Sequence, residues 1–167
     1  MFANAIATLF RMDDQTWQGH ANPWCFWTRL PIAPLLFLAI WSRVWLGAWS
    51  LVLIAAPPLW SWFNARIFAA PKSTNNWVSK GVLGERVWIN RQRVPIPPHH
   101  RIFPHILTGL AAAGLGLSIW GLWQLDLTLT LVGLLLINVG KIWFFDRMAW
   151  LYEDMKTATP EYASWLY

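Results

Sequence analysis

Residues 30–63 read LPIAPLLFLAIWSRVWLGAWSLVLIAAPPLWSWF, and residues 104–145 form a second long apolar stretch. Each stretch is too long for one crossing of a bilayer, because a hydrocarbon core of about 30 Å is spanned by roughly 20 helical residues. Polar residues and tryptophans interrupt the first stretch at residues 41–45 and the second at residues 120–126, as suits turns at a membrane surface. The sequence therefore predicts an all-α membrane protein of two transmembrane helical hairpins, which make four crossings, with interfacial helices.

The composition agrees with a membrane protein. Hydrophobic residues make up 56% of the chain and charged residues only 13%, and the charges cluster outside the two apolar stretches, whereas a soluble domain spreads them evenly. Most of the fifteen tryptophans stand near the predicted ends of the crossings, where their rings suit the lipid headgroup region. The sole cysteine, Cys25, excludes an intramolecular disulfide bond.

The orientation follows from the basic residues. The segment between the two apolar stretches holds seven of the thirteen, whereas the two turns hold only Arg43. Because positively charged loops stay in the cytoplasm, the linker and both chain termini are predicted to be cytoplasmic, and both turns face outward.

The chain is predicted to be a single membrane domain, residues 1–167. Its successive parts are an interfacial N-terminal segment (1–23), a first hairpin (24–68), a basic cytoplasmic linker (69–103), a second hairpin (104–145) and an interfacial C-terminal tail (146–167). Apolar residues at helical spacing within residues 2–10 predict a short helix in the interface, with a disordered tail as the alternative. In the linker, capping residues 73–75 predict a helix over residues 77–88.

The third crossing carries a ridge of small residues at a spacing of four, which predicts close helix packing in lipid. The ridge and its neighbours are Thr108, Gly109, Ala112, Ala113 and Gly116. In the fourth crossing, Asn138 is predicted to form a hydrogen bond to a neighbouring helix, with contact to a substrate as the alternative.

All four histidines fall at the predicted cytoplasmic face, and the fourth crossing ends there with several carboxylates. Imidazole and carboxylate groups together can bind zinc, iron or manganese. The candidate metal or polar cluster comprises His20, His99, His100, His105 and Asp146. Two alternatives stay open: these histidines form hydrogen bonds to headgroups, or His105 is an axial ligand of a haem or pigment. No catalytic residue can be assigned from the sequence.

Basic residues beside a membrane attract anionic headgroups at about 1 kcal/mol each. This attraction accounts for the net charge of +5 without nucleic acid, so nucleic-acid binding is not expected. The candidate headgroup-binding residues are Lys80, Arg86, Arg91 and Arg93.

Three segments carry a resemblance to a known family: HANPW (20–24), SKGVLGERVW (79–88) and KIWFFDRM (141–148). They are similar to a family of small bacterial membrane proteins of unknown function. The resemblance implies a bacterial inner-membrane protein, and it brings no activity and no functional residues.

Two functions compete. The favoured one is a non-enzymatic accessory subunit that packs against membrane lipids and a larger membrane complex with its pigments, or against further copies of itself. The alternative is a small membrane enzyme with a metal or acid–base site at the cytoplasmic interface, acting on a lipid or other amphiphile. Transport is less favoured, because the crossings lack the ionisable residues that mark a transport path.

Overall fold

A computed structural model describes residues 14–167, so the helix predicted within residues 2–10 lies outside the described residues. All regular elements of the described part are helical. In chain order they are α2 (Asp14–His20), α3 (Pro23–Arg29), α4 (Ile32–Trp41), α5 (Arg43–Leu46), η1 (Gly47–Trp49), α6 (Ser50–Ile67), α7 (Trp77–Asn90), η2 (Pro98–His100), α8 (Phe103–Gln124), α9 (Leu127–Met155) and α10 (Pro160–Ser164).

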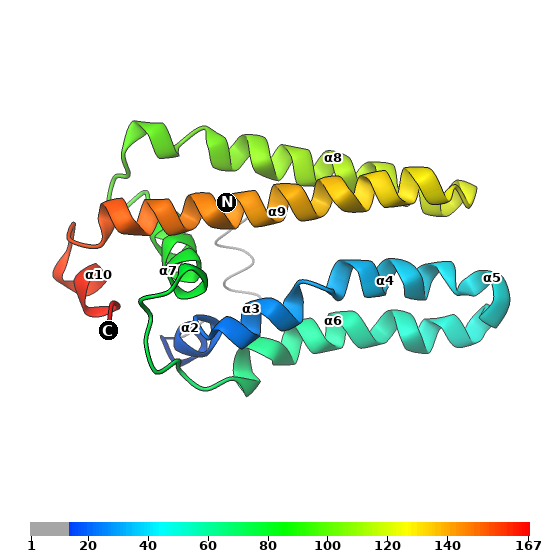
Figure 1. Ribbon diagram of the computed structural model, residues 1–167, viewed down its shortest axis with the longest axis horizontal. Helices are drawn as coiled ribbons and strands as arrows, with labels where there is room; N and C mark the ends of the chain where they lie inside the picture. The colour runs from blue at the N-terminus through cyan, green and yellow to red at the C-terminus, as the bar shows by residue number, and fades with distance from the viewer. Residues whose placement is uncertain (1–13) are drawn as a thin grey trace.

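The long helices form two hairpins that lie side by side (Figure 1). The first pairs α4 with α6 through α5 and η1, and the second pairs α8 with α9. Both turns lie at one end of the molecule, and α2, α7 and α10 gather at the other end (Figure 1), which we call the polar end. The predicted all-helical hairpin architecture is thus confirmed.

Three stretches are long and apolar enough to cross a membrane, by length and composition: Pro23–Asn64, Pro98–Gln124 and Leu127–Met155. The first contains both arms of the first hairpin, and α4 alone has only 10 residues. Because a full crossing takes roughly 20 helical residues, α4 needs the preceding α3 to complete its arm. The count of four crossings stays a prediction.

The turn of the second hairpin is built from two adjacent residues. Leu125 adopts a left-handed conformation, with φ of 57°, and its N–H donates to the carbonyl of Gly121 at the end of α8. Asp126 then caps α9, since its carboxylate accepts from the N–H of Leu129 at 2.9 Å. The polar residue at the centre of the apolar stretch is therefore the helix cap that reverses the chain.

Small residues bring α8 and α9 into close contact. A Cβ atom added at Gly133 would lie 2.5 Å from the carbonyl oxygen of Gly114, and one added at Gly140 would lie 2.9 Å from the carbonyl oxygen of Leu107. The hydroxyl of Ser118 donates across the contact to the carbonyl of Thr130 at 3.2 Å. Backbones can approach this closely in lipid only where side chains are small.

The predicted ridge does not make this contact. Its five residues, Thr108, Gly109, Ala112, Ala113 and Gly116, are all exposed. No atom lies within 4 Å of a Cβ added at Gly109 or Gly116. Small residues occupy two neighbouring stripes of α8, and the stripe containing Gly114 and Ser118 is the one that faces α9. Asn138 likewise donates to Leu134 of its own helix at 2.9 Å rather than to a neighbour.

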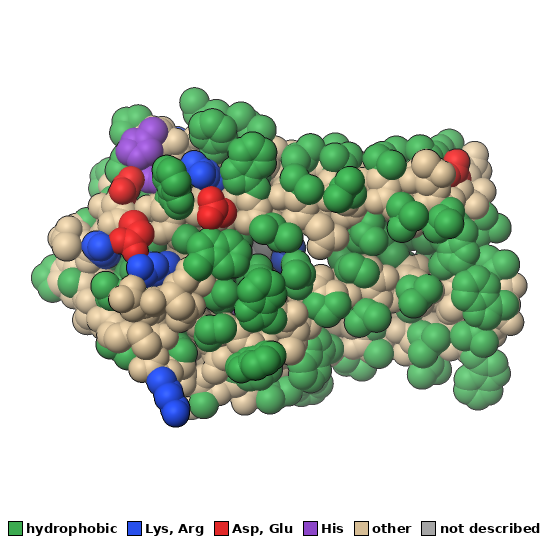
Figure 2. All heavy atoms as spheres, in the orientation of Figure 1, with side chains coloured by type: hydrophobic (Ala, Val, Ile, Leu, Met, Phe, Trp, Pro, Cys, Tyr) green, Lys and Arg blue, Asp and Glu red, His purple; other side chains and the backbone are tan. Residues whose placement is uncertain are grey.

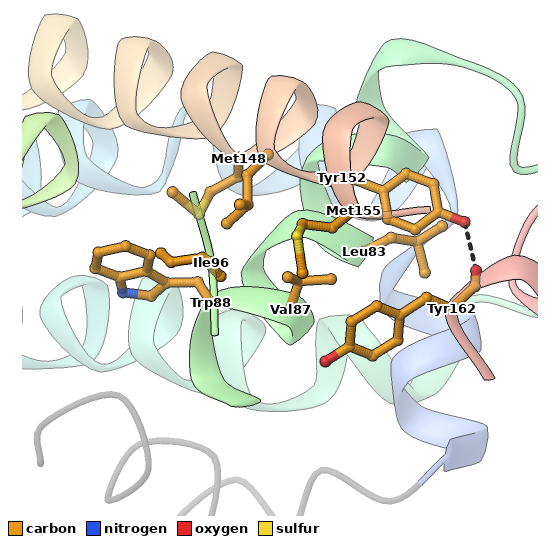
Figure 3. Close-up of a cluster of buried hydrophobic side chains, with 9 residues drawn as sticks. Leu83, Val87, Trp88, Ile96, Met148, Tyr152, Met155 and Tyr162 are labelled. Atoms are coloured by element: carbon orange, nitrogen blue, oxygen red, sulfur yellow. Dashed lines mark hydrogen bonds between the residues drawn. The ribbon is translucent and has the colours of Figure 1, made fainter. Parts of the chain in front are cut away.

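The polar end has its own apolar core, where α7 crosses α9 (Figure 3). The side chain of Asn76 caps α7 by accepting from the N–H of Ser79 at 2.9 Å, so the predicted linker helix is confirmed. The Tyr152 hydroxyl donates to the carbonyl of Tyr162 at 3.0 Å (Figure 3), which ties the C-terminal tail to α9. The core consists of Leu83, Val87, Trp88, Ile96, Met148, Leu151, Tyr152, Met155 and Tyr162.

The exposed tryptophans fall into two groups. Those near the hairpin turns are Trp45, Trp49, Trp120 and Trp123, and those toward the polar end are Trp24, Trp27, Trp60, Trp62, Trp77, Trp143 and Trp150. Along α9, the distance from Leu127 beside the turn is about 24 Å to Trp143 and about 35 Å to Trp150 at 1.5 Å per residue. These distances bracket the hydrocarbon thickness of about 30 Å.

Apolar side chains cover the arms of both hairpins, whereas most charged groups visible on this face lie at the polar end (Figure 2). The surface therefore has the pattern of a protein with its arms in a bilayer and its polar end in the interface.

The tips of the hairpins are joined by Arg43. Its guanidinium donates to the carbonyl of Leu122, near the end of α8, and to that of Ile40 at 3.2 Å. Basic side chains suit the unpaired carbonyls at a helix C-terminus. Between this contact and the polar end, contacts between the arms of the two hairpins are few.

Candidate functional site

A group of two histidines and one carboxylate lies at the polar end of the second hairpin. One oxygen of Asp154, Oδ2, lies 3.1 Å from His99 Nε2 and 2.8 Å from His100 Nε2. The side chain of His100 is 5% exposed, against 65% for His99 and 49% for Asp154. The group is thus anchored on one side and open to solvent on the other.

Two rigid elements bring these side chains together. Proline at residues 97 and 98 begins the short helix η2, which carries both histidines. Asp154 lies in the last turns of α9, where its neighbours Leu151 and Met155 are buried in the core. Packing therefore holds His100 and the helical turn that carries Asp154, whereas the His99 side chain is exposed.

The donor set suits a transition metal. The three ligand atoms all lie within 4.8 Å of one another, and this is the one group of its kind in residues 14–167. Tetrahedral Zn²⁺, with bonds of about 2.0–2.2 Å, holds neighbouring ligand atoms roughly 3.3 Å apart. The two nitrogen-to-oxygen distances, 3.1 and 2.8 Å, lie slightly below that spacing. Two histidines and a carboxylate form a recurrent catalytic zinc set, which leaves one position for water or substrate.

Of the five residues predicted to form a cluster, only His99 and His100 come together. Asp146 instead accepts from Trp77 Nε1 at 2.9 Å and pairs with Arg147 at 3.3 Å. Asp146 and Asp154 are about 12 Å apart along α9, so the helix carries Asp146 away from η2. In the sequence, the helical pattern continues beyond the end of the apolar stretch. This continuation indicates that Asp154 belongs to the same helix and could have identified it as a candidate.

His105 is exposed, and its ring lies 5.5 Å from that of Trp88. It is not a member of the group formed by His99, His100 and Asp154. Its assignment as a haem or pigment ligand stays a prediction.

His20 lies in a second polar cluster, at the junction of α2, α3 and α7. Its Nδ1 is 3.2 Å from the NH1 atom of Arg29, and its Nε2 is 3.8 Å from Glu85 Oε2. Burial lowers the pKa of His20 below its ordinary value, and the nearby carboxylate of Glu85 acts in the opposite direction. A neutral ring can accept a hydrogen bond from Arg29 and donate one toward Glu85.

Cys25 belongs to the same cluster, although no partner for it could be predicted from the sequence. The thiol is buried, lies 3.2 Å from His20 Nδ1 and donates to Asn64 Oδ1 at 2.8 Å. Asn64, also buried, donates in turn to the Thr28 hydroxyl at 2.7 Å. Buried thiols of this kind are chemically inert, which indicates a structural role for Cys25. Because Asn64 belongs to α6 and its two partners belong to α3, these hydrogen bonds hold α3 against α6.

The four predicted headgroup-binding residues have different roles. Lys80 pairs with Glu153, and Arg86 pairs with Asp14 and lies 3.8 Å from Glu161. The guanidinium of Arg91 lies 4.3 Å from the centre of the Trp88 ring, and Arg93 is exposed. Because Lys80 and Arg86 are neutralised within the chain, the set does not form one anion site.

The fold defines a class of protein: an all-helical chain with three stretches able to span a membrane and a polar end that carries two clusters of ionisable groups. The chain belongs to DUF6653, a family of unknown function, which it matches over residues 2–165. Membership of an uncharacterised family, expected from the three quoted segments, is thereby confirmed. No curated protein and no solved structure matches the chain.

Proposed function

We propose that this protein is an integral membrane metalloprotein of the bacterial inner membrane, which holds a divalent transition-metal ion at the membrane surface through His99, His100 and Asp154. Two hairpins anchor it by four crossings, and the basic linker keeps its polar end and both termini in the cytoplasm. The proposal rests on a single observation: two imidazoles of η2 converge on one carboxylate oxygen of α9.

The exposed side of this site indicates the kind of chemistry. Three protein ligands leave a coordination position open, and Zn²⁺ in such a site activates water for hydrolysis. Because the site lies at the polar end of a membrane hairpin, the accessible substrates are the polar head groups of lipids or other amphiphiles. The proposed activity is therefore metal-dependent hydrolysis of an amphiphile.

A second candidate, the accessory subunit favoured by the sequence, has its own support. In the apolar windows of the three stretches, only 22%, 22% and 17% of the residues are buried within the chain. A membrane helix left uncovered by its own chain faces lipid or another protein. A partner complex, or a further copy of this chain, would cover those faces.

Metal analysis separates the two candidates. After loading with Zn²⁺ and removal of excess metal, the protein purified in mild detergent is expected to retain about one Zn²⁺ per chain, as a three-ligand site implies. The variants Asp154→Asn and His99→Ala/His100→Ala should lose it. His105→Ala is the matched control, because His105 is an exposed histidine outside the group.

Equal retention in all variants would refute the site, as would a wild-type protein that retains no zinc. A metal-free protein that co-purifies with a larger membrane complex would support the accessory subunit instead.

A further inference from the structure

Each of the two hairpins has a positively charged residue within one of its membrane-spanning stretches. Arg29 ends α3 within the apolar stretch Pro23–Asn64, and Lys141 lies in α9 within the stretch Leu127–Met155. Lys or Arg atoms are visible recessed between the two hairpins in Figure 2. Charged side chains within membrane-spanning stretches are rare and usually have partners, so these two are candidates for a functional site.

The charges of this region do not cancel. The rings of Phe26 in α3 and Phe145 in α9 are stacked with their centroids 4.4 Å apart. Arg29 and Lys141 each lie about one helical turn from these rings, toward the hairpin turns, so the two cations are neighbours. His20 contacts Arg29 and lies 3.8 Å from Glu85, which brings the four groups into one cluster. The neutral ring of His20 contributes no charge, and Glu85 contributes one negative charge against the two cations. Among the described residues, the cluster therefore carries one excess positive charge.

Donors remain available in the same place. The NH1 atom of Arg29 contacts His20 and the guanidinium also interacts with the Cys25 thiol, but no oxygen atom in the described part of the chain accepts a hydrogen bond from it. The ammonium of Lys141 likewise has no hydrogen bond or ion pair to a described residue. A guanidinium and an ammonium with one unbalanced charge suit a single phosphate, because arginine and lysine are the usual phosphate ligands.

The surroundings identify the source of that phosphate. Trp27 and Trp143, each two residues from one of the cations, are 50% and 47% exposed, as is typical of side chains at headgroup depth. Large apolar side chains on the arms of both hairpins are exposed as well, so acyl chains can lie along them. We infer that Arg29 and Lys141 bind the phosphate head group of an anionic membrane lipid between the two hairpins.

This site is separate from the proposed metal site and does not depend on it. Lipid binding is measured on the full-length protein in detergent, from the midpoint of thermal unfolding as phosphatidylglycerol is added. Phosphatidylglycerol is expected to raise the midpoint, whereas phosphatidylcholine and inorganic phosphate are not. The variants Lys141→Gln and Arg29→Gln should bind phosphatidylglycerol about tenfold more weakly, which corresponds to the loss of one charged hydrogen bond.

Lys72→Gln is the matched control, because it removes one positive charge from an exposed residue of the linker and should leave the shift unchanged. Lys141→Gln keeps the test valid if Arg29→Gln fails to fold, since Lys141 has no hydrogen bond or ion pair to a described residue. If Lys72→Gln weakened phosphatidylglycerol binding as much as Lys141→Gln, the proposed site would be overturned, and the lipid would be attracted by the overall positive charge instead. An equal shift with phosphatidylcholine would overturn it too, and an equal shift with inorganic phosphate would overturn the lipid as its source.

Discussion

Replacing Gly84 with alanine is expected to lower the free energy of unfolding by about 3 kcal/mol, at the upper end of the usual cost of overpacking. The new Cβ atom would overlap the backbone carbonyl of Met148, where α7 crosses α9. A backbone atom cannot rotate away as a side chain can, so the two helices must separate and loosen the core of the polar end. Thermal unfolding in detergent measures the loss.

Gly116→Ala is the control for this substitution. Gly116 also lies within a long helix, but no atom is within 4 Å of its added Cβ. The variant should be as stable as the wild type or slightly more so, because alanine favours a helix over glycine by up to about 1 kcal/mol. Similar losses in both variants would contradict the close crossing of α7 and α9.

Tyr152→Ala is expected to cost about 3–5 kcal/mol, the range for removing a large buried aromatic side chain. Tyr152 is fully buried among Leu83, Met155 and Tyr162 in the core of the polar end (Figure 3). Because Asp154 follows it by two residues, the loosened end of α9 should also weaken zinc binding at His99 and His100. Unfolding and zinc retention are measured on the same sample.

Tyr152→Phe separates packing from hydrogen bonding. It keeps the ring and removes only the bond to the Tyr162 carbonyl, so the expected loss is about 1 kcal/mol. A loss as large as that of Tyr152→Ala would show that the hydrogen bond, rather than the packed ring, holds the C-terminal tail.

The hairpins could be predicted from the sequence because length and apolar character alone decide them. Two apolar stretches, each too long for one crossing, leave few arrangements other than a reversal, and Asp126 marks one reversal as a helix cap. The orientation of side chains around a helix was harder to predict. Small residues on adjacent stripes of α8 give the same spacing signal, and only the position of α9 selects the stripe of Gly114 over that of Gly116.

The candidate sites were predicted less completely, because they depend on contacts between distant segments. His99 and His100 could be named as candidates from the sequence, but the choice of Asp154 over Asp146 as their neighbour depends on how far α9 extends before η2 meets it. Nothing in the sequence pairs Cys25 with Asn64, which lies in another helix. Lys80 and Arg86 seemed available for headgroups because their partners, Glu153 and Asp14, are also distant in sequence.

If both hairpins cross the membrane, as we propose, both polar clusters lie on one side of it. Single cysteines placed in a Cys25→Ser background test this most directly, since serine keeps a donor for Asn64. The labelled positions are exposed: Ala48→Cys and Gln124→Cys at the two tips, and Lys72→Cys and Thr157→Cys at the polar end. Intact cells that express each variant are treated with a membrane-impermeant maleimide. We expect both tips to react in intact cells and both polar-end positions to react only after the membrane is opened. Reaction of one tip from the same side as the polar end would contradict this expectation.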